Sequence, residues 1–184
     1  YPLDNTGHTE RNKGGVLRYT NELLTAKLSY RKNRKKNGVC LCVRNEATSD
    51  FEATLRRERP VNSDFYRSDY EIERPYQLVT HEITLTRIRL NDIGIGALEL
   101  TYAFQKNDRD EFDIIRGESS RAQYMFILRS HTLDASFEHQ QLEIGKNMRL
   151  EGLMGVSGML QENVYRGLPL LSDYRSFSGG GFVL

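Results

Sequence analysis

Residues 78–106, LVTHEITLTRIRLNDIGIGALELTYAFQK, decide the fold that the sequence predicts. The stretch is rich in β-branched residues, and its polar and apolar positions alternate with the period of two that is typical of a strand. Residues 91–96 interrupt the alternation with two glycines and an asparagine, which accept the positive φ of a tight turn. The stretch therefore predicts two long antiparallel strands joined by a short turn, each with one apolar face.

The apolar positions of the first strand change phase. Odd-numbered positions are apolar up to Leu85, whereas even-numbered positions are apolar from Ile88 onward. A strand changes its apolar face only through an extra residue, a twist or burial on both sides. We therefore expect a β-bulge near Thr86 and Arg87.

The remaining segments extend this β-rich pattern. Alternation on both sides of residues 31–38, which end in Asn-Gly, predicts a hairpin of strands 23–31 and 38–44. Further strands are expected at 112–115, 122–129 and 136–144, with the second central and covered on both faces. A short helix is expected at 51–57, before Pro60. The predicted fold class is mainly β or α+β, an antiparallel sheet or sandwich with one or two short helices.

Three segments are harder to assign. Residues 147–166 carry three glycines at intervals of three, which leaves open a helix with a packed glycine edge, a glycine-rich loop crossing a sheet, or a membrane-inserting loop. Residues 1–15 predict a flexible N-terminal arm. Residues 169–184 predict a C-terminal arm, which leaves residues 16–168 as a single β-rich domain. We expect the core to include Tyr102, Phe104, Phe126 and Leu128.

Positive charge is concentrated near the N-terminus. Residues 11–36 hold nine Lys or Arg residues against one Glu, a net charge of +8, whereas the rest of the chain carries −7. Such segregation indicates contact with a polyanion or with an acidic surface of another copy. The residues expected to bind nucleic acid or an anionic membrane surface, from the predicted hairpin tip, are Lys27, Arg31, Lys32, Arg34, Lys35 and Lys36.

The C-terminus offers a second interaction site. Residues 178–181 are Ser-Gly-Gly-Gly, and Phe182, Val183 and Leu184 follow. A flexible linker that ends in three apolar side chains predicts an arm that docks in a groove, either on its own domain or on a neighbouring copy. We therefore expect these three residues to contribute to oligomerisation.

The sequence contains no motif that indicates catalysis, a metal site or a cofactor. The patterns for zinc proteases, hydrolase nucleophiles and phosphate loops are absent, so neither a metal nor a small-molecule cofactor is expected. The two cysteines, Cys40 and Cys42, are expected to be free, because two residues on one strand face lie about 7 Å apart. Free thiols fit a reducing compartment, so we expect a cytoplasmic or other intracellular protein, or a component of a virion.

These features favour a non-enzymatic structural protein that self-associates and binds nucleic acid or an anionic surface, as in a small viral capsid or matrix protein. Two alternatives remain open. One is a hydrolase or transferase whose site is assembled from scattered His, Asp and Ser residues; a deep pocket in which His81 or His139 meets carboxylates would favour it. The other is a monomeric adaptor domain, which oligomeric state would distinguish from the assembly protein.

Overall fold

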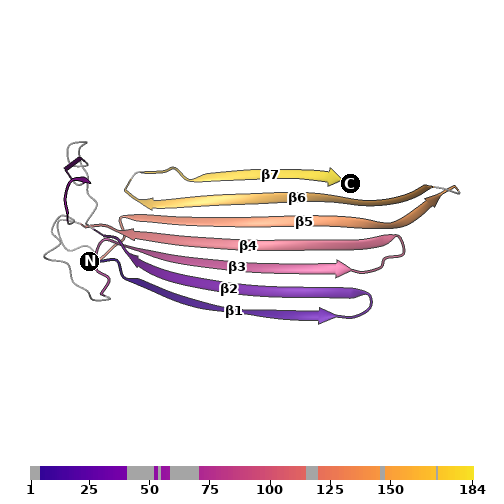
Figure 1. The fold of residues 1–184 in the computed structure, drawn as a ribbon, viewed down its shortest axis with the longest axis horizontal. Helices are drawn as coiled ribbons and strands as arrows, with labels where there is room; N and C mark the ends of the chain where they lie inside the picture. The colour runs from indigo at the N-terminus through magenta and orange to yellow at the C-terminus, as the bar shows by residue number, and fades with distance from the viewer. Residues whose placement is uncertain are drawn as a thin grey trace.

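The protein folds as one open antiparallel sheet of seven strands (Figure 1). This computed structural model describes residues 5–40, 52–53, 55–58, 71–114, 120–145, 148–168 and 170–184. Each strand pairs with the next one in sequence, in the order β1-β2-β3-β4-β5-β6-β7. The strands are β1 (His8–Thr20), β2 (Leu24–Gly38), β3 (Tyr76–Leu90), β4 (Gly96–Phe112), β5 (Tyr124–Ile144), β6 (Met148–Gly167) and β7 (Tyr174–Val183). The expectation of a mainly β, antiparallel fold is confirmed.

The hairpin predicted from residues 78–106 is formed by β3 and β4. Leu90 pairs with Leu98 beside the turn, and the ladder continues without a register shift to Tyr76 and Phe112. The bulge expected near residues 86 and 87 is therefore wrong. No residue is inserted where the apolar positions change face. One face of β3 is apolar up to Leu85, and the other face is apolar from Ile88 onward. The sheet has its register shift elsewhere, between β5 and β6 at His139 and Leu142.

Strands in this sheet are longer than the sequence pattern predicts. β4 continues beyond residue 106 to Phe112, and β5 is one strand of 21 residues where two were expected. Of the segment 147–166, residues 148–166 belong to β6 and form neither a helix nor a loop. Of the predicted short helix at 51–57, the structure describes 52–53 and 55–57, with helical backbone at Glu52, Ala53 and Leu55.

The basic segment lies within a strand and not at a hairpin tip. β2 runs without interruption from Leu24 to Gly38, and the turn of its hairpin is at residues 21–23, where it meets β1. The predicted second strand, 38–44, lies mostly outside the described residues. The Asn-Gly pair ends β2 instead of turning it. Gly38 is needed there because a Cβ atom would overlap the carbonyl oxygen of Asn5. Cys40 follows β2 and is disulfide-bonded, so the strand geometry that predicted free thiols does not apply to it.

Both segments predicted to be arms contain edge strands of the sheet. Residues 8–15 belong to β1, and residues 174–183 form β7. In each case main-chain pairing with the neighbouring strand orders a polar or glycine-rich segment that has little apolar surface of its own.

The sheet is a single layer with almost no core. Contacts between strands in the described part of the chain join sequential neighbours only. Four described residues are buried, namely Gly96, Gly155, Asn163 and Tyr165. Tyr102 is 39% exposed, and Phe104, Phe126 and Leu128 are half-buried, so the expected core residues are not enclosed. The central strand β5 is likewise not covered on both faces, because no second layer packs on it among these residues.

Candidate functional site

The two faces of the sheet differ in chemistry. Side chains of directly paired residues in an antiparallel sheet project from the same face, so each row of partners can be assigned to one face. One row runs across all seven strands through Tyr19, Ala26, Ile88, Leu100, Ala135, Val156 and Gly181. The adjacent row, on the opposite face, runs through Arg18, Lys27, Arg87, Thr101, Asp134, Ser157 and Gly180. We name these the band face and the polar face.

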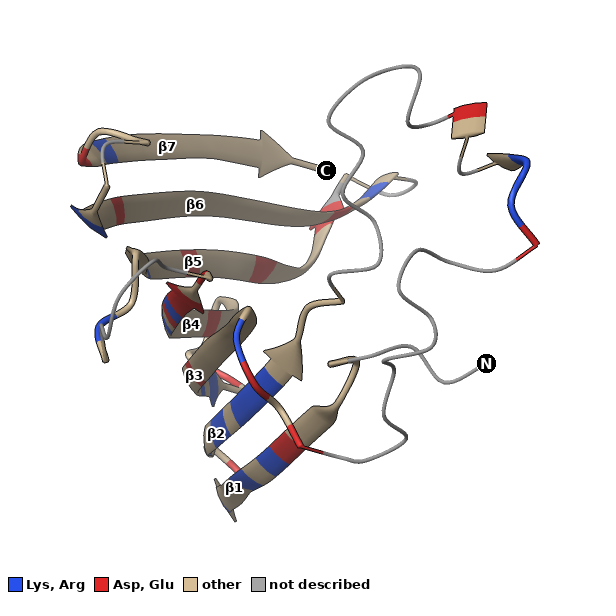
Figure 2. Cartoon of the chain, turned by 90° about the vertical axis from the view of Figure 1, so that its left-hand side faces the viewer, with Lys and Arg blue, Asp and Glu red and all other residues tan. Residues whose placement is uncertain are grey.

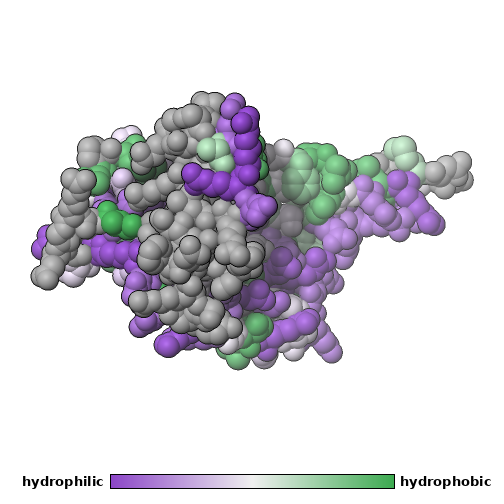
Figure 3. All heavy atoms as spheres, turned by 60° about the vertical axis from the view of Figure 1, so that its left-hand side comes forward, coloured by the Kyte–Doolittle hydropathy of each residue, from purple (hydrophilic) through white to green (hydrophobic). Residues whose placement is uncertain are grey.

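The apolar row belongs to a broad strip on the band face, which we call the apolar band. Its members are Leu17, Tyr19, Leu24, Ala26, Leu28, Tyr30, Ile88, Leu90, Leu98, Leu100, Tyr102, Phe104, Leu133, Ala135, Phe137, Met154, Val156, Leu160, Phe177 and Val183. On β2 the band spans Leu24 to Tyr30, about 20 Å along the strand at its usual rise per residue. On the side of the molecule seen in Figure 3, a group of hydrophobic residues lies above hydrophilic ones at the right of the view.

The apolar band is open. Leu17 is 72% exposed, Val156 63%, Leu133 51% and Phe177 77%. Isolated exposed apolar side chains are normal on protein surfaces, but a continuous strip that crosses seven strands is far larger than the patches of ordinary monomers. Large exposed apolar strips are typical of interaction surfaces.

The band ends in a row that is rich in aromatic and apolar residues, and a row of charges lies beyond it. This end row joins Gly15, Tyr30, Thr84, Phe104, His131, Leu160 and Phe177. Within it, the His131 and Phe104 rings lie 4.8 Å apart, and Nδ1 of His131 lies 2.8 Å from the hydroxyl of Tyr102. The next row is the charged row, formed by Lys13, Lys32, Glu82, Lys106, Arg129, Glu162 and Arg175.

Ion pairs neutralise part of the charged row. Lys32 Nζ lies 2.5 Å from Oε1 of Glu82, and this contact lowers the pKa of Glu82 and raises that of Lys32. Glu162 lies between Arg175, at 2.8 Å, and Arg129, at 3.6 Å. Its pKa is lowered, mainly by the hydrogen bonds from Arg175. The carboxylates of this row are therefore ionised at neutral pH and are held by cations.

The six basic residues predicted to bind an anion do not form one surface. Lys27, Arg31 and Lys35 lie on the polar face, whereas Lys32, Arg34 and Lys36 lie on the band face. Three of the six have partners among the residues that the structure describes. Lys32 pairs with Glu82, and Lys35 pairs with Glu10 at 3.4 Å. Lys36 donates to the carbonyl of Ile72 and lies 4.3 Å from the centre of the Tyr76 ring.

Two cations that sequence reasoning did not select complete a cluster on the band face. Arg11 is directly opposite Arg34, and Lys13 is directly opposite Lys32. Together with Lys36 these residues form what we call the basic patch, and Figure 2 shows the Lys and Arg positions along β1 and β2. The sequence analysis did not foresee this cross-strand pairing, because it assigned residues 1–15 to a flexible arm outside the sheet.

The predicted oligomerisation residues are found in or after β7. Phe182 pairs with Gly155 of β6, and its ring lies over that glycine on the polar face. Val183 pairs with Met154, and the main chain of Leu184 is hydrogen-bonded to Leu153 in both directions, at 2.8 and 3.1 Å. Val183 and Leu184 are each 79% exposed. The C-terminal residues thus contact the chain's own sheet, and their side chains remain largely accessible.

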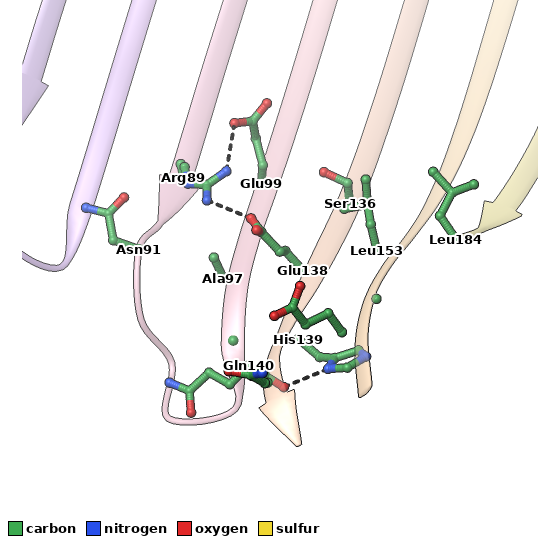
Figure 4. A pocket seen from close by; sticks show the side chains of 14 residues that line it. Arg89, Asn91, Ala97, Glu99, Ser136, Glu138, His139, Gln140, Leu153 and Leu184 are labelled. Atoms are coloured by element: carbon green, nitrogen blue, oxygen red, sulfur yellow. Dashed lines mark hydrogen bonds and ion pairs between the residues drawn. The ribbon is translucent and has the colours of Figure 1, made fainter. Parts of the chain in front are cut away.

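A pocket on the polar face, near the β3–β4 turn, contains titratable groups (Figure 4). Arg89 bridges the carboxylates of Glu99 and Glu138 there, at 3.8 and 3.0 Å. Nδ1 of His139 lies 2.7 Å from the carbonyl oxygen of Gln140, to which it donates. Within the described residues, no hydrogen bond or ion pair joins His139 to a carboxylate. His81 lies elsewhere, on the polar face between Asn33 and Asn107. Among the described residues, the pocket therefore does not join His81 or His139 to a carboxylate.

Two further features are absent from the described residues. They contain no group of three or more His, Cys, Asp or Glu side chains arranged to hold a metal ion. No helix among them has the length and apolar character needed to cross a membrane.

Comparison with known proteins returned no match to a family model, to a curated protein or to a solved structure.

Proposed function

We propose that this chain is a non-enzymatic structural protein that assembles in a lipid bilayer, with its apolar band against the acyl chains. The observation that carries the proposal is the exposed band itself, which crosses all seven strands at one level and is bordered by a row of charges. Bilayer hydrocarbon is an apolar solvent that can cover such a strip along its whole length.

The sequence of rows supports lipid as the partner. Moving along the strands, apolar rows are followed by the row that contains Tyr30, Phe104 and Phe177, and then by the charged row. Aromatic side chains are favoured where hydrocarbon meets lipid headgroups, and charged side chains are favoured beyond that boundary. The opposite face is polar at the same level, as the row through Lys27, Thr101 and Asp134 illustrates. Only one face of the sheet is suited to hydrocarbon.

The edges of the sheet support self-association. β1 and β7 each have a neighbour on one side only, so half of their main-chain groups are unpaired among the described residues. An unpaired main-chain group costs several kcal/mol in hydrocarbon, so both edges require partner strands there. We infer that strands of neighbouring copies supply them, in line with the self-association expected from the sequence.

The distribution of the basic residues favours lipid over nucleic acid. The six predicted cations are divided between the two faces, three on each, so they do not all face one nucleic-acid backbone. The cations that do cluster, in the basic patch, share their face with the apolar band, which favours a lipid headgroup as their partner. A lipid-facing band also implies a location at a membrane, in place of the cytoplasmic, other intracellular or virion location expected from free thiols.

A pair of adjacent substitutions tests the proposal. Leu100 lies on the band face and Thr101, the next residue, lies on the polar face of the same strand. An arginine in the hydrocarbon costs about 2–4 kcal/mol near the bilayer centre. We therefore expect Leu100→Arg to reduce partitioning into phosphatidylcholine vesicles, measured by flotation, whereas Thr101→Arg leaves it near the wild-type value.

Circular dichroism in detergent micelles serves as the folding control for both variants. Equal partitioning of the two variants, or failure of the wild-type protein to float with vesicles, would show that the band does not face lipid. Light scattering of the micellar protein tests self-association separately, and a monomer would refute the proposed pairing of edge strands between copies.

A further inference from the structure

We infer that the basic patch of β1 and β2 binds the phosphate groups of anionic lipid headgroups. The inference rests on the proposed function, because it assigns the lipid class that the bordering surface prefers. The patch consists of Arg11, Lys13, Lys32, Arg34 and Lys36 on the band face. These five cations give the border of the apolar band a concentrated positive charge on β1 and β2.

Like charges face each other directly within the patch. Arg11 pairs across the strands with Arg34, and Lys13 pairs with Lys32. Side chains at directly opposed positions have Cβ atoms about 4.5–5.5 Å apart, where two like charges repel. The positive charge of Arg34 also opposes protonation of Lys32, although the hydrogen bond from Lys32 to Glu82 outweighs that effect. The repulsion between these opposed cations is unfavourable in the isolated sheet. A bound anion would remove this repulsion because it attracts both members of each pair.

Three of these cations lack a counter-ion on the protein. In the described part of the chain, the side chains of Arg11, Lys13 and Arg34 make no hydrogen bond or ion pair, and all three are exposed. Elsewhere along the charged row, each cation lies against a carboxylate, as Arg129 and Arg175 both do against Glu162. Among the described residues of this row and of the basic patch, the cations without a carboxylate partner thus include Arg11, Lys13 and Arg34 of the first two strands.

The position of the patch identifies the anion as a headgroup phosphate. Lys13 and Lys32 belong to the charged row, one row beyond the one that contains Tyr30, and Arg11 and Arg34 lie one row further out. With the apolar band in hydrocarbon, these side chains reach the depth of the lipid phosphates. Arginine and lysine both bind phosphate there, and arginine can do so with two parallel hydrogen bonds.

A charge-matched pair of triple variants provides the test. Arg11→Gln, Lys13→Gln and Arg34→Gln remove three cations from the patch. Arg18→Gln, Lys27→Gln and Arg31→Gln remove three cations from the polar face of the same two strands. Partitioning of each protein is measured with phosphatidylcholine vesicles and with vesicles that also contain phosphatidylglycerol. Each cation near an anionic surface strengthens binding about five-fold. The increase in partitioning given by phosphatidylglycerol should therefore be roughly a hundred-fold smaller for the first variant than for the wild-type protein.

We expect the polar-face variant to keep that gain, and we expect molar salt to abolish it in the wild-type protein. An equal loss in both triple variants would overturn the inference, because it would reflect net charge alone. The inference would also be overturned if the patch variant kept the full gain in partitioning given by phosphatidylglycerol. It would be overturned as well if the patch variant lost binding to an RNA oligonucleotide while its response to phosphatidylglycerol was intact. Partitioning into pure phosphatidylcholine reports separately on the apolar band, so failure of the proposed function remains distinguishable.

A second measurement separates a binding role from a structural one. In detergent without anionic lipid, Arg11→Gln relieves repulsion with Arg34 and should raise the thermal midpoint, not lower it. A lowered midpoint would show that Arg11 stabilises the sheet directly and would contradict the inference.

Discussion

Substitution of Gly155 by alanine should detach the end of β7, which carries the C-terminal apolar residues. A Cβ atom at Gly155 would lie 2.6 and 2.7 Å from two carbon atoms of the Phe182 ring and 3.1 Å from the carbonyl oxygen of Ala135. Contacts this short force the ring away, because the backbone of the central strand β5 cannot move as easily as a side chain on the edge strand. The ring then loses its place on the sheet.

The magnitude follows from the exposed fraction of Phe182. The residue is 47% exposed, so roughly half of the ~200 Å² of an aromatic side chain is covered. At about 25 cal/mol per Å² this contact contributes about 2.5 kcal/mol, which is the loss expected for Phe182→Ala. Gly155→Ala should cost about 2 kcal/mol, since the lower conformational entropy of alanine returns about 0.5 kcal/mol.

A double-mutant cycle measures this contact. Once Phe182 is alanine, Gly155→Ala should change the free energy of unfolding by less than about 0.5 kcal/mol, because the ring it displaces is gone. Urea unfolding gives the free energies, and hydrogen exchange of the β7 amides locates the loss. Gly180→Ala is the matched control, since no atom lies within 4 Å of the position that its Cβ atom would take. Equal costs of Gly155→Ala in both backgrounds would refute the reasoning.

Three further perturbations test other parts of the sheet. The pKa of Glu10 is lowered to about 2, chiefly by the hydrogen bond from the Asn12 side-chain amide and then by that from Asn33. The stability that Glu10 contributes is therefore present above pH 4.5 and is lost as the pH falls toward 2. A carboxyl titration by NMR checks this midpoint, and Glu10→Gln should remove the acid-dependent hydrogen exchange of the β1 amides. Gly96→Ala should cost about 1–3 kcal/mol, because Gly96 has φ of 150° and a Cβ atom would overlap the carbonyl oxygen of Glu138, whereas Gly15→Ala, in open space, should be tolerated. Phe126→Ala should lower the free energy of unfolding in urea by about 2 kcal/mol, less than the 3–5 kcal/mol lost in an enclosed core. The reason is that the Phe126 ring is only half-buried, with its centre 5.1 Å from that of the Tyr165 ring. A loss above about 4 kcal/mol would contradict the single-layer description.

The hairpin of β3 and β4 could be predicted because its information is local. Alternation over residues 78–90 and 97–104, with glycines between, is sufficient to identify two strands and a turn. Alternation of apolar and polar residues did not identify β1 and β7 as strands. Their residues are polar or glycine-rich, and they join the sheet because their main-chain groups pair with β2 and β6. A hydropathy pattern does not indicate main-chain pairing of this kind, because the pattern depends on side chains.

Strand lengths were underestimated for a related reason. In β4 the apolar alternation ends at Phe104, and charged residues such as Lys106 and Asp108 continue the same strand. A change of this sort resembles a turn in the sequence, although here it marks the boundary between the apolar band and the charged row. The glycines of β6 misled in the same way. Gly155 leaves room for Phe182, a contact that depends on pairing with a strand from another part of the sequence.

The candidate site was foreseen only in part. Lys32, Arg34 and Lys36 were selected from their density in the sequence, and they do share one face. Lys27, Arg31 and Lys35 were assigned to the same surface because a hairpin tip was expected, whereas a strand sends alternate side chains to opposite faces. Arg11 and Lys13 join the patch through the pairing of β1 with β2, which the sequence pattern did not indicate.

The most direct test of the lipid-facing band uses tryptophan as a depth-sensitive probe. The protein contains no tryptophan, so a single substitution at each position from 98 to 105 of β4 gives an unambiguous fluorescence signal. In vesicles with brominated acyl chains, we predict strong quenching at the even-numbered positions, which include Leu98, Leu100 and Tyr102, and weak quenching at the odd-numbered positions between them. Quenching without this period of two, or strongest at Glu99 and Thr101, would contradict the account.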